Sequence, residues 1–306
     1  MYHGRLSFFS LIPSLFYSLS TAFSIIFISQ LVTRVNPMLS LLISVSLATL
    51  FFHLINYKKL KQTYRPFFIF WKRSIVLNLV VAIIWISVFL GLSMIDPYLY
   101  IVIYFVVSSI ISFFIIFMRT KKQIFLLSSL LLLIIIAVCI AHYLYLHHAE
   151  IRTLGIGFAI LSGIFSYFYR AEAKTYSVIT KNSASMILCV RSYGILLCSF
   201  IFYLSMLHLH WESPLIQVTD RFLVLMLLVV VFSFVIPLYC NQKGIENAGP
   251  EMHSIVCASI PIITLLLSQL SQGTYRSEQT VFNYSTAILV LILLVLPNFR
   301  GILKRG

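Results

Sequence analysis

Ten apolar stretches follow one another through this sequence, each about as long as the core of a lipid bilayer is thick. A membrane-spanning helix needs about 20 predominantly apolar residues. Candidates lie at residues 8–31, 38–56, 74–95, 98–118, 123–146, 153–170, 184–207, 221–240, 252–271 and 280–298. Only 10% of the residues are charged, whereas a soluble domain has about 25%. The sequence therefore predicts an all-α polytopic membrane protein with ten transmembrane helices and no inserted soluble domain.

The positions of Lys and Arg predict the orientation of this chain, because cytoplasmic loops of membrane proteins are enriched in both. With ten spans and a cytoplasmic N-terminus, 17 basic residues fall on the cytoplasmic side: Arg5, Lys58, Lys59, Lys61, Arg65, Lys72, Arg73, Arg119, Lys121, Lys122, Arg170, Lys174, Lys181, Lys243, Arg300, Lys304 and Arg305. Four fall outside: Arg34, Arg152, Arg221 and Arg276. We expect a multi-pass protein of the inner (plasma) membrane with both termini in the cytoplasm. The net charge of +14 is then explained without a nucleic-acid partner.

Two stretches share the same order of features: an apolar helix, a glycine, a polar break, a proline and a second apolar helix. One runs from Lys243 to Leu267, and the other lies 153 positions earlier. Gly and Pro mark turns, so we expect an elbow at each break. The shift pairs Gly244 with Gly91, Pro250 with Pro97, and Ile263 with Ile110. Because five helices per half is an odd number, the sequence predicts two inverted five-helix repeats, residues 1–150 and 151–306, an architecture common in secondary transporters.

Several Gly and Pro residues are candidates for hinges or gates in such an architecture. The elbows supply four of them, and a proline within the ninth predicted helix supplies the fifth. An interior proline removes one helical hydrogen bond and usually kinks the helix. The hinge candidates are Gly91, Pro97, Gly249, Pro250 and Pro261.

The first predicted helix of each half carries small residues four positions apart. They are Ser10, Ser14, Ser18 and Ala22 in one, and Gly155, Ala159 and Gly163 in the other. Such stripes lie on one helix face and allow close approach of another backbone. Helix packing is the favoured interpretation, with direct contact to a substrate as the alternative.

The segments LGIGFAILSGIFSYFYRAEAK, SASMILCVRSYGILL and KGIENAGPEMHSIVCASIPIITLLL resemble EamA-type repeats, and with its length and ten predicted helices the chain is similar to the drug/metabolite transporter superfamily. The resemblance implies secondary transport of a small metabolite without ATP, often the export of amino acids or related compounds. It also implies a central cavity between the first, third, fourth, sixth and ninth helices. The chain departs from an exact repeat at Ser108, which occupies the position of Pro261, and at Arg191, which has no basic counterpart in the second helix.

Charged residues within the predicted spans are scarce. All eight Asp and Glu residues fall at loops or helix ends, so no carboxylate is placed to relay protons through the membrane. This favours facilitated diffusion, exchange, or coupling through another residue. Arg191 lies well inside a span. It could extend to the cytoplasmic interface or pair structurally, or it could contact an anion.

The candidate substrate-binding residues combine hydroxyl, amide and aromatic groups with one basic side chain. Aromatic rings with polar groups suit a pocket for a small zwitterion or a ring, although each residue could instead serve helix packing. The candidates are Tyr17, Thr21, Asn78, Trp85, Tyr104, Ser108, Tyr167, Arg191 and Ser259. We expect a small polar or zwitterionic solute, because a bare cation would find no buried counter-charge.

Other classes of function have little support in the sequence. There is no GxxxxGK[ST] loop for nucleotide phosphates, and no HExxH or GxSxG motif of a hydrolase. Five histidines near the predicted outer face, His142, His147, His148, His208 and His210, lack nearby acids or cysteines at metal-binding spacing. We expect no enzyme activity, cofactor or metal, but a transporter that acts as a monomer or homodimer in the bilayer. The alternatives are a translocator of lipids or lipid-linked sugars, and a non-transporting partner subunit.

Overall fold

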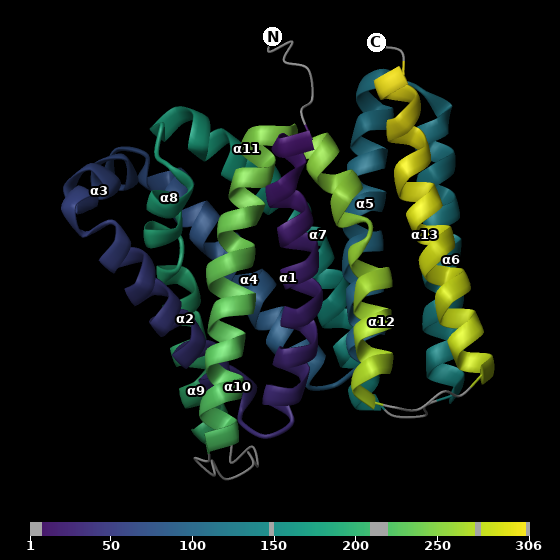
Figure 1. Ribbon diagram of the computed structural model, residues 1–306, viewed down its shortest axis with the longest axis horizontal. Helices are drawn as coiled ribbons and strands as arrows, with labels where there is room; N and C mark the ends of the chain where they lie inside the picture. Colours follow the sequence, from purple (N-terminus) through teal and green to yellow (C-terminus); the bar gives the residue numbers. More distant parts are fainter. Residues whose placement is uncertain (1–7, 147–149, 209–219, 273–276, 304–306) are drawn as a thin grey trace.

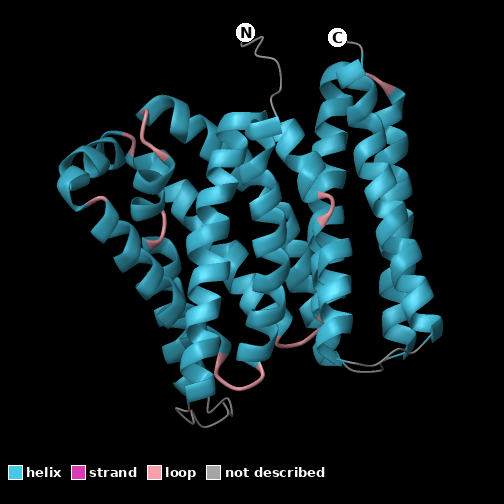
Figure 2. Ribbon diagram, in the orientation of Figure 1, coloured by secondary structure: helices cyan, strands magenta, loops and turns pink. Residues whose placement is uncertain are grey.

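The computed structural model describes residues 8–146, 150–208, 220–272 and 277–303. These residues are helical and contain no strand (Figure 2). Among them, eight helices are long and apolar enough to cross a membrane, and two shorter apolar helices span Ile260–Leu270 and Val281–Val295. The predicted all-helical class is therefore confirmed, and the apolar helices agree with a polytopic membrane protein.

The helices, which are labelled in Figure 1, match the predicted spans closely in the first half of the chain, whereas several spans of the second half are interrupted. Their bounds are α1 Phe8–Val32, α2 Pro37–Ile55, α3 Leu60–Ile69, α4 Trp71–Leu92, α5 Pro97–Thr120, α6 Gln123–Leu146, α7 Glu150–Thr180, α8 Ala184–Val190, α9 Tyr193–His208, α10 Asp220–Val229, α11 Ile236–Cys257, α12 Ile260–Gln272 and α13 Ser277–Leu303. A 3₁₀ turn, Tyr57–Lys59, precedes α3, and a π-helical segment, Val230–Val235, joins α10 to α11.

Two helices start with the same combination of a side-chain cap and a proline. Asn36 Oδ1 accepts from the backbone N–H of Met38 at 2.9 Å, just before α2. Asp96 Oδ1 accepts from the N–H of Tyr98 at 2.8 Å, just before α5. Proline fits the first helical position because its missing N–H would have no intrahelical partner there. The predicted break at Asp96-Pro97 is therefore a capped helix start.

Helix α7 is longer than the sequence predicts, because it continues past Arg170 to Thr180. The polar extension contains good helix formers such as Ala, Glu and Lys. It also packs on the protein: Ala173 and Tyr176 are buried, and Ser74 Oγ on α4 donates to the Tyr176 hydroxyl at 3.3 Å. Lys181 has a φ of 54°, and this left-handed conformation ends the helix.

The chain reverses direction within α11, although its backbone stays helical through Gly249-Pro250. The side chains of Asn241 and His253 form a hydrogen bond of 2.9 Å, whereas residues 12 apart in a straight helix are separated by about 18 Å. The expected elbow is present as a reversal, but the expected stop in the helix is not. Figure 1 shows α11 rising to the top of the view and α12 descending beside α1.

The helix around Pro261 is interrupted instead of kinked. Helix α11 ends at Cys257 and α12 begins at Ile260, with a short turn between them that is visible as a loop in Figure 2. Pro261 therefore occupies the first turn of α12, where its missing N–H costs little. The prediction of an interior kink at this proline was wrong.

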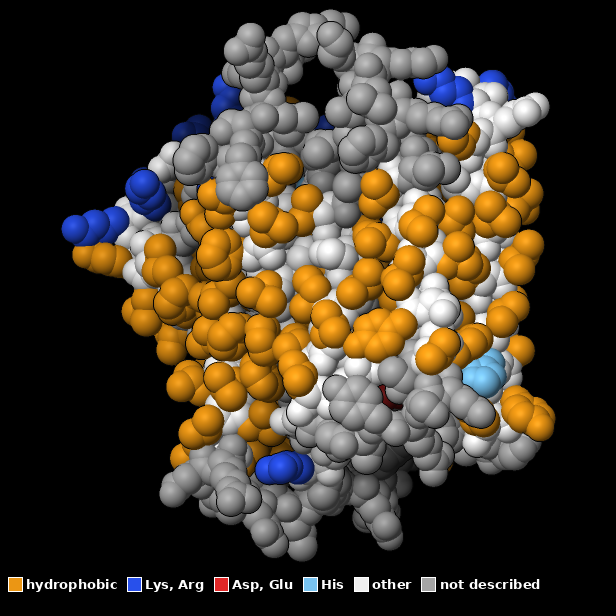
Figure 3. Space-filling view, turned by 45° about the vertical axis from the view of Figure 1, so that its right-hand side comes forward, with side chains coloured by type: hydrophobic (Ala, Val, Ile, Leu, Met, Phe, Trp, Pro, Cys, Tyr) orange, Lys and Arg blue, Asp and Glu red, His pale blue; other side chains and the backbone are white. Residues whose placement is uncertain are grey.

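The bundle is held together largely by contacts between helices that lie far apart in the sequence. In the centre, α1 packs on α11 and α7 packs on α4, while α12 packs on α1 and α5 packs on α7. At the periphery, α2 packs on α9 and α6 packs on α13. Apolar side chains cover the broad face in Figure 3, and most of the visible Lys and Arg side chains lie near its upper end. The exposed apolar surface is what a lipid-facing bundle requires.

Gly155 and Gly163 allow α7 to approach its neighbours closely. A Cβ at Gly163 would lie 2.8 Å from the backbone oxygen of Tyr104 on α5, and one at Gly155 would lie 2.7 Å from the Ile95 side chain. A Cβ at Gly157, on the same helix, would meet nothing within 4 Å. The stripe of small residues on α7 therefore serves helix packing.

We expect Gly163→Ala to lower thermal stability, by about 1–3 kcal/mol, because a backbone atom of α5 must move to accept the new methyl group. Gly157→Ala should be neutral or stabilising by up to about 1 kcal/mol, since alanine favours a helix over glycine. Thermal unfolding of the two purified variants in the same detergent measures the difference. Equal melting temperatures would contradict the close approach of α5 and α7.

Candidate functional site

A cavity of about 80 Å³ lies among the central helices α1, α4, α5, α7 and α11. Five of the predicted substrate-binding residues line it: Tyr17, Thr21, Trp85, Tyr104 and Arg191. Polar side chains that sequence reasoning did not select as binding residues also line it: Ser24, Tyr100, Tyr169, Ser233 and Asn241. The rest of the wall is mostly aliphatic, supplied by residues such as Ile84 and Val88.

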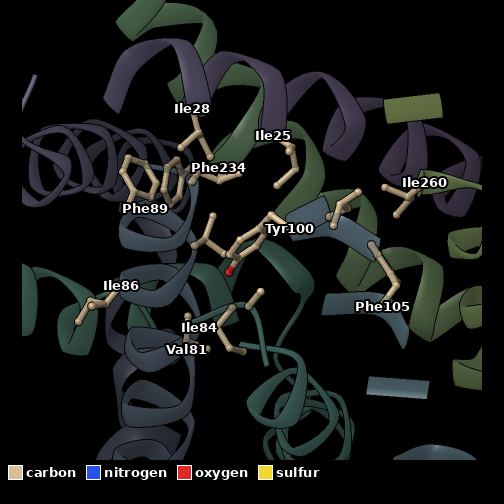
Figure 4. Packing of buried hydrophobic residues seen from close by; sticks show 14 of the residues in the cluster. Ile25, Ile28, Val81, Ile84, Ile86, Phe89, Tyr100, Phe105, Phe234 and Ile260 are labelled. Atoms are coloured by element: carbon tan, nitrogen blue, oxygen red, sulfur yellow. The ribbon is translucent and has the colours of Figure 1, made fainter. Parts of the chain in front are cut away.

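The core beside this cavity is built from aromatic and aliphatic side chains (Figure 4). The rings of Trp85 and Phe234 lie 4.3 Å apart, and those of Phe89 and Phe234 lie 6.3 Å apart. In Figure 4 the Tyr100 hydroxyl points among aliphatic side chains, and it donates to Ser162 Oγ at 2.7 Å. The cavity is therefore held between packed rings and a few hydrogen-bonded hydroxyls.

Arg191 is the cation that lines the cavity, and its side chain is buried with 1% exposure. Of the three alternatives left open by the sequence, extension to the membrane interface does not agree with this burial. Its guanidinium lies over the Tyr169 ring at 5.1 Å, while Nε and Nη1 have no hydrogen-bond partner among the described residues. Buried charges are normally paired, so this arrangement is unusual.

The three carboxylates whose side chains the structure describes lie elsewhere. Asp96 caps α5. Glu172 pairs with Arg73 at 3.0 Å, and Glu246 pairs with Lys243 at 3.0 Å. None of these carboxylates lines the cavity. Among the described side chains, the positive charge of Arg191 therefore has no acidic partner in the cavity wall.

Asn78 fixes the backbone around Arg191 without lining the cavity. Its Nδ2 donates to the backbone oxygens of Ser74 at 2.9 Å and Val190 at 3.0 Å, and its Oδ1 accepts from Gly194 N–H at 2.9 Å. Helix α8 ends at Val190 and α9 begins at Tyr193. Asn78 therefore satisfies backbone groups on both sides of the break that contains Arg191.

Irregular backbone borders the cavity at a second place, the π-helical segment Val230–Val235. Ser233 in this segment is buried, and its hydroxyl has no hydrogen-bond partner among the described residues. Single π-helical turns occur often at functional sites, and membrane transporters build binding sites from interrupted helices. The two irregularities bring Arg191 and Ser233 to one cavity.

The remaining predicted binding residues do not line the cavity. Ser108 is buried and accepts a hydrogen bond from the Arg170 guanidinium. Tyr167 packs its ring edge-on against Phe168 at 5.7 Å. Ser259 Oγ donates to the backbone oxygen of Val256 at 2.7 Å, across the turn between α11 and α12. These residues support helix contacts and turns.

His253 forms a buried cluster that the sequence did not reveal. Its Nδ1 contacts Ser14 Oγ at 2.9 Å, its Nε2 contacts Asn241 Oδ1 at 2.9 Å, and Cys257 Sγ lies 3.4 Å from Nε2. One feature of the sequence could have pointed to His253. The shift of 153 positions that pairs Gly91 with Gly244 also pairs Tyr100 with His253, so the two residues occupy equivalent positions in the two similar stretches.

The paired glycines Gly91 and Gly244 face these two residues in the same way. A Cβ at Gly91 would lie 2.3 Å from the Tyr100 ring, and one at Gly244 would lie 2.5 Å from the His253 ring. At both reversals of the chain, the glycine makes room for the aromatic residue nine positions later.

A second cavity, of about 700 Å³, lies between α5, α6, α12 and α13 and includes the turn before α5. His142 lines it and packs on Phe282, with ring centroids 4.3 Å apart. His208 ends α9, whereas His147, His148 and His210 lie outside the described residues. Among the described residues, no three His, Cys, Asp or Glu side chains are grouped so that they could hold a metal ion.

No model of a known protein family matches the sequence. The search of curated proteins gives no significant match.

Proposed function

We propose that this protein is a secondary transporter of a small polar or zwitterionic organic metabolite, such as an amino acid, working by alternating access. The observation that carries the proposal is the central cavity, whose wall combines residues from both halves of the chain. Helices α1, α4 and α5 contribute from residues 1–150, and α7, α11 and the break at Arg191 contribute from residues 151–306. A site between two halves of a bundle can open to either side when the halves rock.

The proposal includes ten spans arranged as two inverted repeats, and hydrogen bonds across the central helices support it. Tyr100 and Tyr104 on α5 bond Ser162 and Ser166 on α7, both at 2.7 Å. The reciprocal pair of helices, α1 and α11, is joined in the same way: His253 bonds Ser14, and Ser18 Oγ donates to the Val256 oxygen at 3.2 Å. The serines on α1 and α7 correspond through one constant shift of 148 positions, since Ser14 matches Ser162 and Ser18 matches Ser166.

The neighbours of each helix support the same arrangement. In the proposed repeats, α1 corresponds to α7, α4 to α11, and α5 to α12. The contact of α1 with α11 then corresponds to that of α7 with α4, and the contact of α5 with α7 corresponds to that of α12 with α1. The contacts of α2 with α9 and of α6 with α13 each join two corresponding helices, so exchanging the halves leaves these contacts unchanged. This is the pattern that a twofold relation between five-helix units produces, and an odd number of spans per unit makes the relation an inverted one.

We expect both termini in the cytoplasm. The start of α1 and the end of α13 lie at the same end of the bundle (Figure 1), and the positive-inside rule assigns the cytoplasm to the side richer in Lys and Arg. A reporter that is active only in the periplasm should therefore be silent when fused after Gly306. The same reporter in the α4–α5 turn, beside Ser93, should be active. The reverse result would contradict the proposed orientation.

Transport itself is tested with purified protein in liposomes. We expect uptake of at least one labelled amino acid down its concentration gradient, without ATP, and no acceleration of the flipping of a fluorescent lipid. Lipid flipping without solute transport would instead favour the lipid or lipid-linked sugar translocator. Absence of both activities would favour a non-transporting partner subunit. Protein-free liposomes provide the background rate.

A further inference from the structure

We infer that Arg191 binds the carboxylate of a solute that carries a single negative group, an inference that rests on the proposed transport function. The central cavity would then be a site for small monocarboxylates, including neutral amino acids. Two features carry this assignment: the unsatisfied guanidinium in the cavity wall, and the mostly apolar surface that faces it.

Two nitrogens of the buried guanidinium lack hydrogen-bond partners among the described residues. Arg191 is 1% exposed, and Nε and Nη1 have no partner among the described residues. The Tyr169 ring, 5.1 Å away, interacts with the face of the guanidinium plane but accepts none of its in-plane hydrogen bonds. Arginine is always charged and presents its N–H groups as a planar fork. A carboxylate fits this fork because it can accept two parallel hydrogen bonds.

The charge balance of the wall favours one negative group over several. Arg191 is the single cation among the described lining residues, and no described carboxylate lines the cavity. A dicarboxylate or a phosphate ester would leave a negative charge without a partner inside the protein, where burial of an unpaired charge costs free energy. A bare cation would meet the positive charge of Arg191. A monocarboxylate neutralises the site.

The rest of the cavity accommodates a small body with few polar groups. Trp85, Ile84 and Val88 give it an aromatic and aliphatic side, and hydroxyls of the wall such as those of Tyr17 and Ser233 could meet an amine. A volume of about 80 Å³ has room for about five to eight water-sized groups. This matches a small monocarboxylate such as alanine or propionate better than a nucleotide or a sugar phosphate.

Acids and their matched amides test the assignment, because each pair differs at the carboxylate alone. The probes are L-alanine and L-alaninamide, L-valine and L-valinamide, and propionate and propionamide, measured by thermal shift and by competition in liposome uptake. We expect wild-type protein to bind at least one acid at least tenfold more tightly than its amide. Arg191→Met should abolish the preference, and Arg191→Lys should keep part of it. Arg73→Met, which removes a half-exposed arginine that pairs with Glu172, should leave the preference unchanged.

The melting temperature without solute provides a second measurement that needs no ligand. Arg191→Met should not melt below wild type, because it removes a buried charge whose Nε and Nη1 have no hydrogen-bond partner among the described residues. The inference is overturned if amides bind as well as acids, if no acid binds, if Arg191→Met keeps the preference, or if this variant melts lower. Transport of neutral solutes with no preference for acids would refute the carboxylate site but leave the proposed transport intact. Failure to transport any solute would refute the transport function itself.

Discussion

Asn78→Leu is expected to abolish transport and to destabilise the protein by about 2–5 kcal/mol. The substitution leaves the Val190 carbonyl and the Gly194 N–H without their partner, and each buried unsatisfied group costs about 1–3 kcal/mol. The space is also tight, because a Cβ on Gly194 would lie 2.6 Å from the Asn78 backbone oxygen. Helix α9 must therefore move away from α4, and the break that carries Arg191 moves with it.

A second asparagine gives the matched control for this effect. Asn182 is buried, but its amide makes one longer bond, to the Thr63 oxygen at 3.4 Å, and it lies away from the cavity wall. Asn182→Leu should lower the melting temperature less and leave solute uptake close to wild type when normalised to folded protein. Uptake per folded molecule and thermal unfolding, measured on both variants, separate the two roles. Wild-type uptake by Asn78→Leu would mean that the α8–α9 break does not need this clamp.

The long helices of the first half could be predicted from the sequence because membrane insertion depends on local composition. Helix α6, residues 123–146, was predicted at the bounds that the structure gives. The capped start at Asp96-Pro97 was also predictable, since its signal lies within two adjacent residues. The reversal at Gly249-Pro250 was predicted as a change of direction, although not as a continuous helical backbone.

The break at Arg191 could not be predicted, because its cause lies far away in the chain. The break at Arg191 depends on Asn78, whose amide bonds Gly194 from a position 116 residues earlier. The π-helical segment around Ser233 had a local signal that sequence reasoning missed, since Pro237 follows one helical turn later and lacks the N–H that would bond the Ser233 oxygen. A nearly uniform apolar composition also hides which face of a helix points inward. For this reason Tyr169 was missed, whereas Tyr167, two positions away, was selected and lies outside the cavity wall.

Pro261 marks a second place where we expect a large effect on the rate of transport, here with little change in stability. The turn between α11 and α12 is closed by the Ser259 N–H to the Val256 oxygen at 3.1 Å, and α12 starts immediately after it. The same Val256 oxygen accepts from Ser18 on α1. A turn inside an apolar span, bonded to a central helix, is a place where the span can bend as the site opens.

Pro261→Ala is expected to slow transport at least tenfold while the amount of folded protein and the melting temperature change little. Proline in a helix interior costs about 3 kcal/mol relative to alanine. Without the proline, the equilibrium between the interrupted helix and a continuous one shifts toward the continuous helix by up to about 100-fold. Pro37→Ala is the control, because Pro37 also lies in a first helical turn, after the Asn36 cap of α2, and should leave the rate unchanged. Initial rates of uptake per folded molecule, compared for both variants, test the prediction. A parallel loss of rate and folded protein in Pro261→Ala would mean that the proline serves the architecture alone.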